Sequence, residues 1–146
     1  MGNVELIPLC RVEVGFGEMI DTGTGPHGRR IIGETATLAV TGERLAGEMA
    51  GKAAADWLLV GADGATGTVD VREAVRTHDG ALIYMRYQGR LDVSTIPSGP
   101  PFFVSGLFET GDERYVWLNH VVAVGRGVFR PDFSGLDYDF YELADA

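Results

Sequence analysis

The segment from Ala65 to Gly89, ATGTVDVREAVRTHDGALIYMRYQG, alternates in side-chain character and so predicts a β-hairpin. Successive side chains of a strand point to opposite faces, which divides the first half of the segment into two sets. One set is largely apolar and comprises Val69, Val71, Glu73, Val75 and Thr77. The other set is largely polar and comprises Asp70, Arg72, Ala74 and Arg76. The Asp79-Gly80 dipeptide that follows is typical of a tight hairpin turn.

The spacing of glycines disfavours helices in the rest of the chain. The 21 glycines recur at short intervals, and no long segment keeps a helical apolar period without one. The best helix candidate is residues 43–59, where Gly47 and Gly51 would each cost a helix interior about 1 kcal/mol relative to alanine. Two strands around a turn remain an alternative there. Further strands are predicted at residues 10–16, 29–40, 42–49, 56–60, 101–109, 115–124 and 138–144.

Eight or nine short strands with turns between them predict an all-β fold, either an antiparallel sandwich or a closed barrel. A barrel is favoured because closure removes exposed strand edges. Residues 94–103 contain three prolines, which predicts a stiff loop rather than a central strand. No linker or internal repeat divides the sequence, so we expect residues 1–146 to form a single β-barrel domain.

Composition narrows the possible partners. The formal net charge is -9 and the pI is about 4.7, so nucleic acid and anionic membrane surfaces are poor partners. The only cysteine, Cys10, cannot form an intrachain disulfide, and its apolar neighbours predict a buried, inert thiol. The N-terminus lacks the pattern of a signal peptide, and no apolar run has the ~20 residues that cross a bilayer. We expect a cytoplasmic protein.

Sequence motifs for cofactors and nucleophiles are weak. Residues 23–28, GTGPHG, match G-x-G-x-x-G, but a β-branched, strand-like segment follows where dinucleotide binding requires a helix. We interpret these residues as a loop, beside which Arg29 and Arg30 could meet an anionic ligand at a barrel mouth. The three histidines lack the spacing of metal ligands, and no nucleophile elbow occurs. We therefore expect neither a metal nor another cofactor.

Asp56 and Trp57 form the strongest candidate for chemistry. Aspartate is depleted in strands, and a buried carboxylate is costly unless it is paired or protonated. Arg72 is a plausible partner from a neighbouring strand. An Asp56–Arg72 pair inside a barrel would be either a structural tie or a clamp on a ligand, and the residues alone leave both interpretations open.

Residues 115–124 also alternate, after the turn-like segment ETGDER. As a strand, this segment would place Trp117 and Asn119 on one face and His120 on the other. The Trp117 face carries an apolar body with a polar group, as ligand pockets do, whereas the His120 face is otherwise aliphatic. We therefore expect Trp117 and Asn119 to face the cavity and His120 to pack outside it.

The spaced segments GRRII, ADW, DG, THDGALIY, FETGDERYVWLN and VGRG together resemble a bacterial family of unknown function, number 3237, in the allene-oxide-cyclase-like group of barrels. The resemblance covers residues 6–143. It implies an eight-stranded antiparallel β-barrel of calycin-like form with a central cavity, often assembled as a homo-oligomer. Glu34 stands in a segment where the family tends to have paired glycines, and it would point either into the cavity or to solvent.

The leading functional hypothesis is a cofactor-independent isomerase, cyclase or lyase acting on a small, largely apolar molecule. Asp56 would be the general acid or base, and Arg72 would stabilise developing negative charge on an oxygen. The expected substrate-binding residues are Trp57, Tyr84, Phe108, Trp117, Asn119 and Arg30. A barrel that binds a hydrophobic molecule without chemistry is the main alternative, and a barrel filled entirely by side chains is the third.

Overall fold

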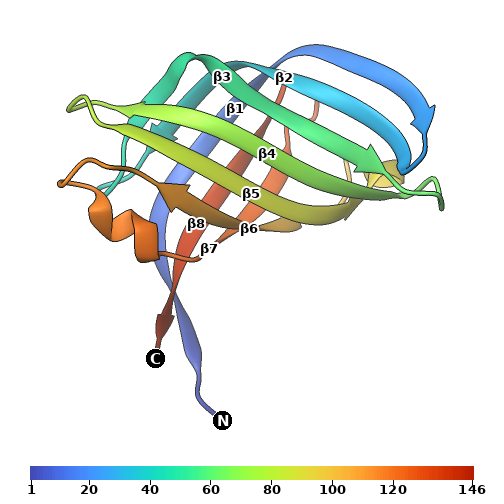
Figure 1. Cartoon of the computed structure of the whole chain (residues 1–146). Helices are drawn as coiled ribbons and strands as arrows, with labels where there is room; N and C mark the ends of the chain where they lie inside the picture. Colours follow the sequence, from blue (N-terminus) through green and yellow to red (C-terminus); the bar gives the residue numbers. More distant parts are fainter.

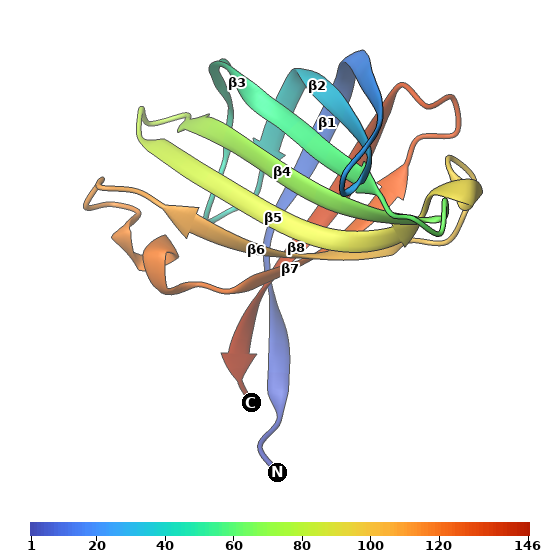
Figure 2. The ribbon, with the colours of Figure 1, turned by 45° about the vertical axis from the view of Figure 1, so that its right-hand side comes forward.

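The strands form a closed antiparallel barrel in the order β1-β2-β3-β4-β5-β6-β7-β8, with β8 paired back to β1. The computed structural model describes residues 1–146, and Figures 1 and 2 show the ring of strands from two sides. The strands are β1 (Val4–Gly25), β2 (Gly28–Thr41), β3 (Gly47–Val60), β4 (Thr66–Thr77), β5 (Leu82–Asp92), β6 (Phe102–Glu109), β7 (Ala123–Phe129) and β8 (Gly135–Asp145). The all-β barrel expected from the sequence is thereby confirmed.

The hairpin predicted from the alternation of residues 65–89 is present as β4 and β5. The largely apolar set of β4 points inward, and its members Val69, Val71, Glu73 and Val75 are buried. Arg72 and Arg76 of the polar set are exposed. The register pairs Thr66 with Asp92 and Arg76 with Leu82 without interruption. A period of two in a strand requires one buried face, and here the buried face is the barrel interior.

The helix candidate at residues 43–59 is a strand instead. Residues from Gly47 to Val60 form the single strand β3, so the separate strands predicted at 42–49 and 56–60 are also wrong in their bounds. The pairing between β3 and β4 shifts between Met49 and Ala54, and Gly51 lies in this interval with φ 59°. Gly51, which suggested a turn, therefore lies at an irregularity within one strand. Its positive φ is a conformation that glycine adopts at little cost.

The prediction of a strand at residues 115–124 is wrong in its first half. Val116–His120 forms a 3-10 helix, η2, and β7 begins only at Ala123. A second 3-10 helix, η1 (Val93–Thr95), starts the proline-rich loop predicted at residues 94–103. Leu118 of η2 is fully buried in the core, and the anchoring of this side chain explains why the segment turns instead of extending.

The two ends of the barrel differ. The connections β1–β2, β3–β4 and β5–β6 lie together at the right of Figure 1, whereas η2 lies at the opposite end. Near η2 the core includes the buried side chains Leu45, Ile83 and Leu118. The first residues of β1 and the last residues of β8 pair with each other and leave the barrel as a projecting stem. No helix in the structure has the length and apolar character needed to span a membrane.

Candidate functional site

The barrel contains a partly open cavity of about 580 Å³ whose wall is mostly apolar. It extends from the middle of the barrel to the end formed by the β1–β2, β3–β4 and β5–β6 connections. Its lining comprises Val14, Phe16, Met19, Asp21, Arg29, Ile31, Gly33, Thr35, Asp56, Leu58, Val60, Gly64, Val69, Val71, Tyr87, Leu91, Val93, Ile96, Phe102, Phe129, Phe133, Leu136 and Tyr138. A mostly apolar wall with a few polar groups is the usual character of a small-molecule site.

Asp56 is the carboxyl group in the deep part of this wall. It lies on the inward face of β3, in register with Val71 of β4. Its Oδ1 accepts a hydrogen bond of 2.9 Å from the Asp70 backbone amide. Burial raises the pKa of Asp56 to about 6, and the amide bond and the charge of Arg30 offset part of that rise. A carboxyl group that titrates near neutrality can both accept and return a proton.

The pairing of β3 with β4 is interrupted beside Asp56. The register pairs Asp56 with Val71 and resumes at Leu59 with Thr68, so Trp57 and Leu58 pair with β2 but not with β4. The Trp57 carbonyl instead accepts a hydrogen bond of 2.8 Å from the Arg30 guanidinium of β2. The Arg30 guanidinium therefore lies on the outer face of the barrel. Its positive charge acts on Asp56 from across β3 and lowers the pKa of that carboxyl group.

Two buried tyrosines line the same cavity. Tyr87 of β5 and Tyr138 of β8 are each 1% exposed, and their rings meet edge to face with centroids 5.0 Å apart. The Tyr138 hydroxyl has no hydrogen-bond partner within the protein. Burial raises the pKa of both phenols well above 10, so they remain donors at neutral pH. An unpaired buried hydroxyl that lines a cavity is suited to a polar atom of a ligand.

Glu73 is a second buried carboxyl group, and it lies behind Tyr87 rather than on the cavity lining. Its Oε2 is 3.4 Å from the Tyr87 hydroxyl, and its Oε1 has no partner. Burial raises the pKa of Glu73 to about 8. The sequence pattern placed Glu73 in the apolar set of β4 but did not single it out. A glutamate among inward valines was the available signal.

A charged pair stands at the open end of the cavity. Arg29 and Asp21 both line it and are joined by a bidentate ion pair across the β1–β2 hairpin. The pair lowers the pKa of Asp21 to about 2, chiefly through the hydrogen bond from Arg29. Of the two adjacent arginines considered for the barrel mouth, Arg29 is the one on the cavity side. The GTGPHG segment beside it forms the tip of the β1–β2 hairpin: Pro26 and His27 make the turn, whereas Gly23 and Gly28, both at positive φ, belong to the flanking strands.

The structure does not bring Arg72 to Asp56. Arg72 follows the inward Val71 on β4 and so points out of the barrel, where its guanidinium stacks 4.9 Å from the centroid of the Trp57 ring. Its carboxylate neighbour is Asp70, at 3.7 Å, and not Asp56. The predicted pair of Asp56 and Arg72 inside the barrel is therefore wrong, because neighbouring residues of a strand face opposite sides. Trp57, expected in the cavity, is on the outer face for the same reason.

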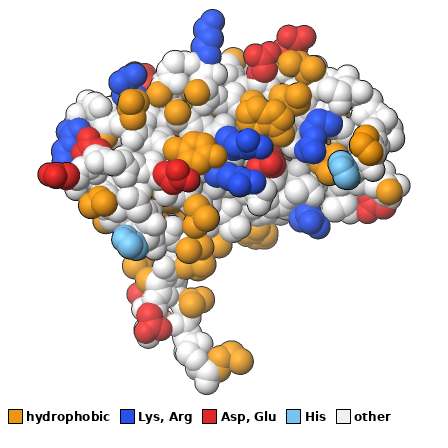
Figure 3. All heavy atoms as spheres, in the orientation of Figure 1, with side chains coloured by type: hydrophobic (Ala, Val, Ile, Leu, Met, Phe, Trp, Pro, Cys, Tyr) orange, Lys and Arg blue, Asp and Glu red, His pale blue; other side chains and the backbone are white.

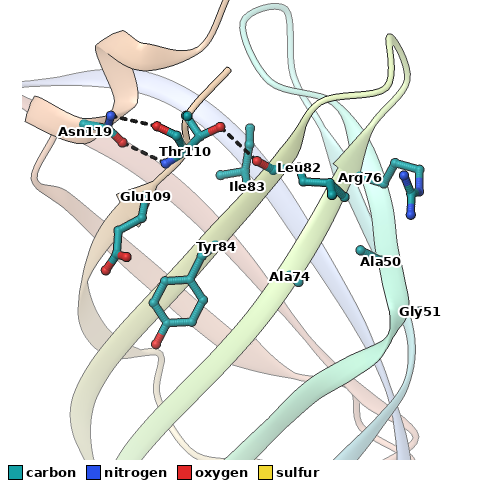
Figure 4. Close-up of a pocket in the computed structure, with 11 residues that line it drawn as sticks. Ala50, Gly51, Ala74, Arg76, Leu82, Ile83, Tyr84, Glu109, Thr110 and Asn119 are labelled. Carbon is teal, nitrogen blue, oxygen red and sulfur yellow. Dashed lines mark hydrogen bonds between the residues drawn. The ribbon is translucent and has the colours of Figure 1, made fainter. Parts of the chain in front are cut away.

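Two other predicted binding residues line a shallow depression on the outer surface, shown in Figure 4. Tyr84 projects outward from β5. Asn119 belongs to η2, and its side-chain amide accepts from the Thr110 amide at 2.8 Å and donates to the Thr110 carbonyl at 2.9 Å. Asn119 therefore ties η2 to the end of β6. Neither side chain lines the barrel cavity, so their predicted orientation is wrong.

The remaining aromatic candidates lie toward the η2 end. Phe108 does point inward and is buried in the core, but it is not part of the cavity lining. Trp117 is partly buried in η2, where its ring packs against the core and the Arg44 guanidinium lies 4.6 Å from its centroid. His120 and Glu34 are both exposed. The Cys10 thiol is buried, and burial raises its pKa to about 12, in agreement with the expected inert cysteine.

A family model for proteins of unknown function, DUF3237, matches residues 4–143. The chain belongs to the DUF3237 family. The VGRG segment of this DUF3237 protein has a structural explanation, since Gly125 and Gly127 face inward beneath aromatic rings. None of the curated proteins matches this chain.

Solved structures share the fold of this DUF3237 protein. A β-barrel-like protein from Acinetobacter baumannii AYE is 29% identical with a TM-score of 0.85, and the match covers 99% of this chain and 98% of that one. A conserved protein of unknown function from Rhodopseudomonas palustris is 21% identical with a TM-score of 0.85, covering 99% and 100%. An enzyme from Penicillium herquei is 23% identical with a TM-score of 0.71, covering 97% and 94%.

Proposed function

We propose that the protein is a cofactor-independent enzyme that transfers a proton to or from a small, largely apolar molecule held in the barrel. The observation that carries this proposal is Asp56, a carboxyl group with a pKa near neutrality in an apolar cavity of about 580 Å³. Isomerisations, cyclisations and eliminations that move a proton at carbon or oxygen use such a group.

The chain offers separate groups for binding and for proton transfer. Aliphatic and aromatic side chains would hold the apolar body of the substrate, and the Tyr138 hydroxyl would donate to one of its oxygens. Asp56 in its ionised form would take a proton from the neighbouring carbon, and in its protonated form would return it. A hydroxyl donor aimed at the oxygen would stabilise the negative charge that develops as the proton leaves.

Arg72 lies outside the barrel and takes no part in this mechanism. A tyrosine hydroxyl would stabilise the developing negative charge in its place. The Penicillium herquei barrel, which is described as an enzyme, supports the idea that this architecture can host catalysis. At 23% identity this is an analogy of fold, and the named residues of the cavity carry the proposal.

Deuterium exchange tests the proposal without knowledge of the natural substrate. 2-Tetralone, a small bicyclic ketone with acidic C–H bonds, would be incubated with the protein in D₂O and followed by proton NMR. We expect exchange above the buffer rate, and a loss of about 10² or more in Asp56→Asn, as for removal of a general base. Arg72→Met is the matched control on the outer face and should retain the rate.

A barrel that binds its ligand without chemistry is the second candidate. The unpaired Tyr138 hydroxyl favours it as well, since a binding site needs only the donor and the apolar wall. Binding of 2-tetralone by the wild-type protein with no exchange above buffer would support this alternative and count against the enzyme. Exchange that persists in a folded Asp56→Asn protein would remove Asp56 from the mechanism.

A further inference from the structure

Glu73 is the most deeply buried charged-type side chain of the barrel, and the mechanism above does not use it. It is 2% exposed and sits on the inward face of β4. Its register neighbours are Ala54 on β3 and Met85 on β5, neither of which can titrate. No lysine, arginine or histidine forms an ion pair with it. A buried carboxylate without a cation is costly, whereas the protonated acid is not.

The contact between Glu73 and Tyr87 also fits a neutral carboxyl group. The Tyr87 hydroxyl oxygen lies 3.4 Å from Glu73 Oε2. A phenol bonded to an ionised carboxylate is drawn to about 2.5–2.7 Å. At 3.4 Å the contact is longer than a charge-assisted bond and also longer than the about 2.5–3.0 Å of an ordinary O–H···O bond, so it is a weak contact in which either group can donate. Tyr87 lines the cavity and Glu73 does not, so Tyr87 lies between Glu73 and any bound molecule.

We propose that protonated Glu73 is a positioning residue, which donates a hydrogen bond to the Tyr87 oxygen and thereby directs the Tyr87 hydroxyl proton into the cavity. A phenol has one proton, so its direction decides what it can bind. When Glu73 donates, Tyr87 is free to donate to the ligand. When Glu73 is ionised, it accepts the Tyr87 proton and leaves only the phenol oxygen facing the cavity.

This arrangement specifies the chemical class of the ligand and so deepens the proposed function, on which it rests. Tyr87 and Tyr138 would both present donors, and their rings are in contact. The group they bind is therefore an acceptor, a carbonyl or enolate oxygen.

Glu73 titrates in a pH range in which the titratable groups around it do not change charge. Those whose charges interact with it are Cys10 of β1, Tyr87 of β5 and Tyr138 of β8. Burial raises the pKa of Cys10 to about 12 and those of both tyrosines well above 10. Asp56, which interacts with the two tyrosines, titrates at about 6. Between pH 7 and 9 Glu73, with its pKa at about 8, is therefore the group of this cluster that changes charge.

The test uses the fluorescent ketone 6-propionyl-2-(dimethylamino)naphthalene, which is neutral in this range and reports hydrogen bonding to its carbonyl by a red shift. We expect the wild-type protein to bind it about tenfold more weakly at pH 9 than at pH 7, because Glu73 becomes ionised over this interval, as for the loss of one hydrogen bond. Glu73→Gln keeps a donor and should retain the low-pH affinity across the range. Tyr87→Phe should show weak, pH-independent binding with a smaller red shift.

The outcomes separate the two proposals. Binding that is independent of pH in the wild-type protein, or a fall that persists in Glu73→Gln, would overturn the positioning role and leave the cavity as a ketone site. Absence of ketone binding by the folded wild-type protein would overturn the proposed function and, with it, this inference. If Glu73→Gln does not fold, carbon-13 NMR of the wild-type Glu73 carboxyl decides: a group already ionised at pH 6 contradicts the proposal.

Discussion

Asp56 illustrates how the barrel wall changes the chemistry of an ordinary residue. Its pKa rises from the usual 3.8 to about 6 because burial disfavours the ionised form, although the Asp70 amide donates to it. The rise is the resultant of opposing contributions, one of which is the charge of Arg30 on the far side of the wall. Burial in the wall thus sets the direction of the shift, and the Asp70 amide and the Arg30 charge reduce its size.

The pKa of Asp56 predicts the pH dependence of the proposed catalysis. If ionised Asp56 is the base, exchange of 2-tetralone should increase from pH 5 to pH 7 with a midpoint of about 6. The measurement is the initial rate of deuterium incorporation, corrected for buffer exchange at each pH. A rate that is flat over this interval while the protein stays folded would contradict the assignment.

Glu73 predicts a pH dependence of stability. Its folded pKa of about 8 is above the usual 4.5, so the folded state binds the proton more tightly than the unfolded state. Its contribution to stability is complete below about pH 4.5 and is lost as pH rises through 8. The raised pKa of Asp56 also makes stability fall with rising pH, but only up to about pH 6. Between pH 6 and 8 the further loss of stability comes from Glu73 rather than Asp56.

We therefore expect Glu73→Gln to change the pH profile of unfolding. Between pH 6 and 8 the free energy of unfolding of the wild-type protein should fall by about 2 kcal/mol more than that of the variant, at about 1.4 kcal/mol per pKa unit. Urea unfolding at the two pH values measures this difference. Parallel profiles for the two proteins would show that Glu73 has the same pKa in the folded and unfolded states.

At the scale of elements, β7 shows why two glycines of the VGRG segment are required. A Cβ on Gly125 would lie 2.7 Å from the Phe140 ring, and one on Gly127 would lie 2.7 Å from the Phe102 ring. The inward face of β7 is therefore narrow, and the space it leaves is filled by aromatic rings from β6 and β8. These rings in turn shape the cavity beside Tyr138, whose own ring is 5.5 Å from that of Phe140.

Gly125→Ala should consequently destabilise the barrel. Overpacking a filled interior typically costs about 1–3 kcal/mol, and the Phe140 ring has to move to admit the methyl group. Thermal unfolding of the variant measures the cost. Gly64→Ala is unsuitable as a control because Gly64 has a φ of 70°, whereas Gly2→Ala, which meets no atom within 4 Å, should leave stability unchanged. An unchanged melting temperature for Gly125→Ala would contradict the packing argument.

Across the whole molecule, the outer surface is divided between charged and apolar regions. Arginine and aspartate side chains interleave on the outer face of β4 and β5, where Asp70 lies between Arg72 and Arg86. Figure 3 shows basic and acidic side chains gathered near the centre of this view, and apolar side chains continuing down the projecting stem. The outer face of β6 presents Phe103 and Leu107, which are 64% and 60% exposed.

The expected homo-oligomer stays a prediction, and the outer face of β6 is where we expect contact. Large exposed apolar side chains grouped on a protein of net charge -9 are more consistent with self-association than with free solvent exposure. Sedimentation velocity should show a species larger than the 15.7 kDa chain, and Phe103→Glu with Leu107→Glu should return it to the monomer. A monomeric wild-type protein would contradict this expectation.

Alternation along the sequence was sufficient for the all-β class because strand alternation is a local property. Val69, Val71 and Val75 alternate with exposed residues whatever the rest of the chain does, and eight such segments have few ways to bury their apolar faces. The same parity placed Glu73 correctly inside. Residues 115–124 alternate too, yet the burial of Leu118 and the bonds from Asn119 to Thr110 turn half of that segment into η2.

The site depended on tertiary structure. Asp56 could be recognised from its unusual place beside an apolar strand, but its partners could not, because they come from strands distant in sequence. The register of β3 against β4 sets Asp56 opposite the inward Val71, and therefore on the other face from Arg72, and closure of the ring brings Tyr87 and Tyr138 into contact. Local alternation thus determined the inward set of β4, whereas register, the η2 turn and barrel closure decided where Trp57, Tyr84 and Asn119 point and which inward residues meet.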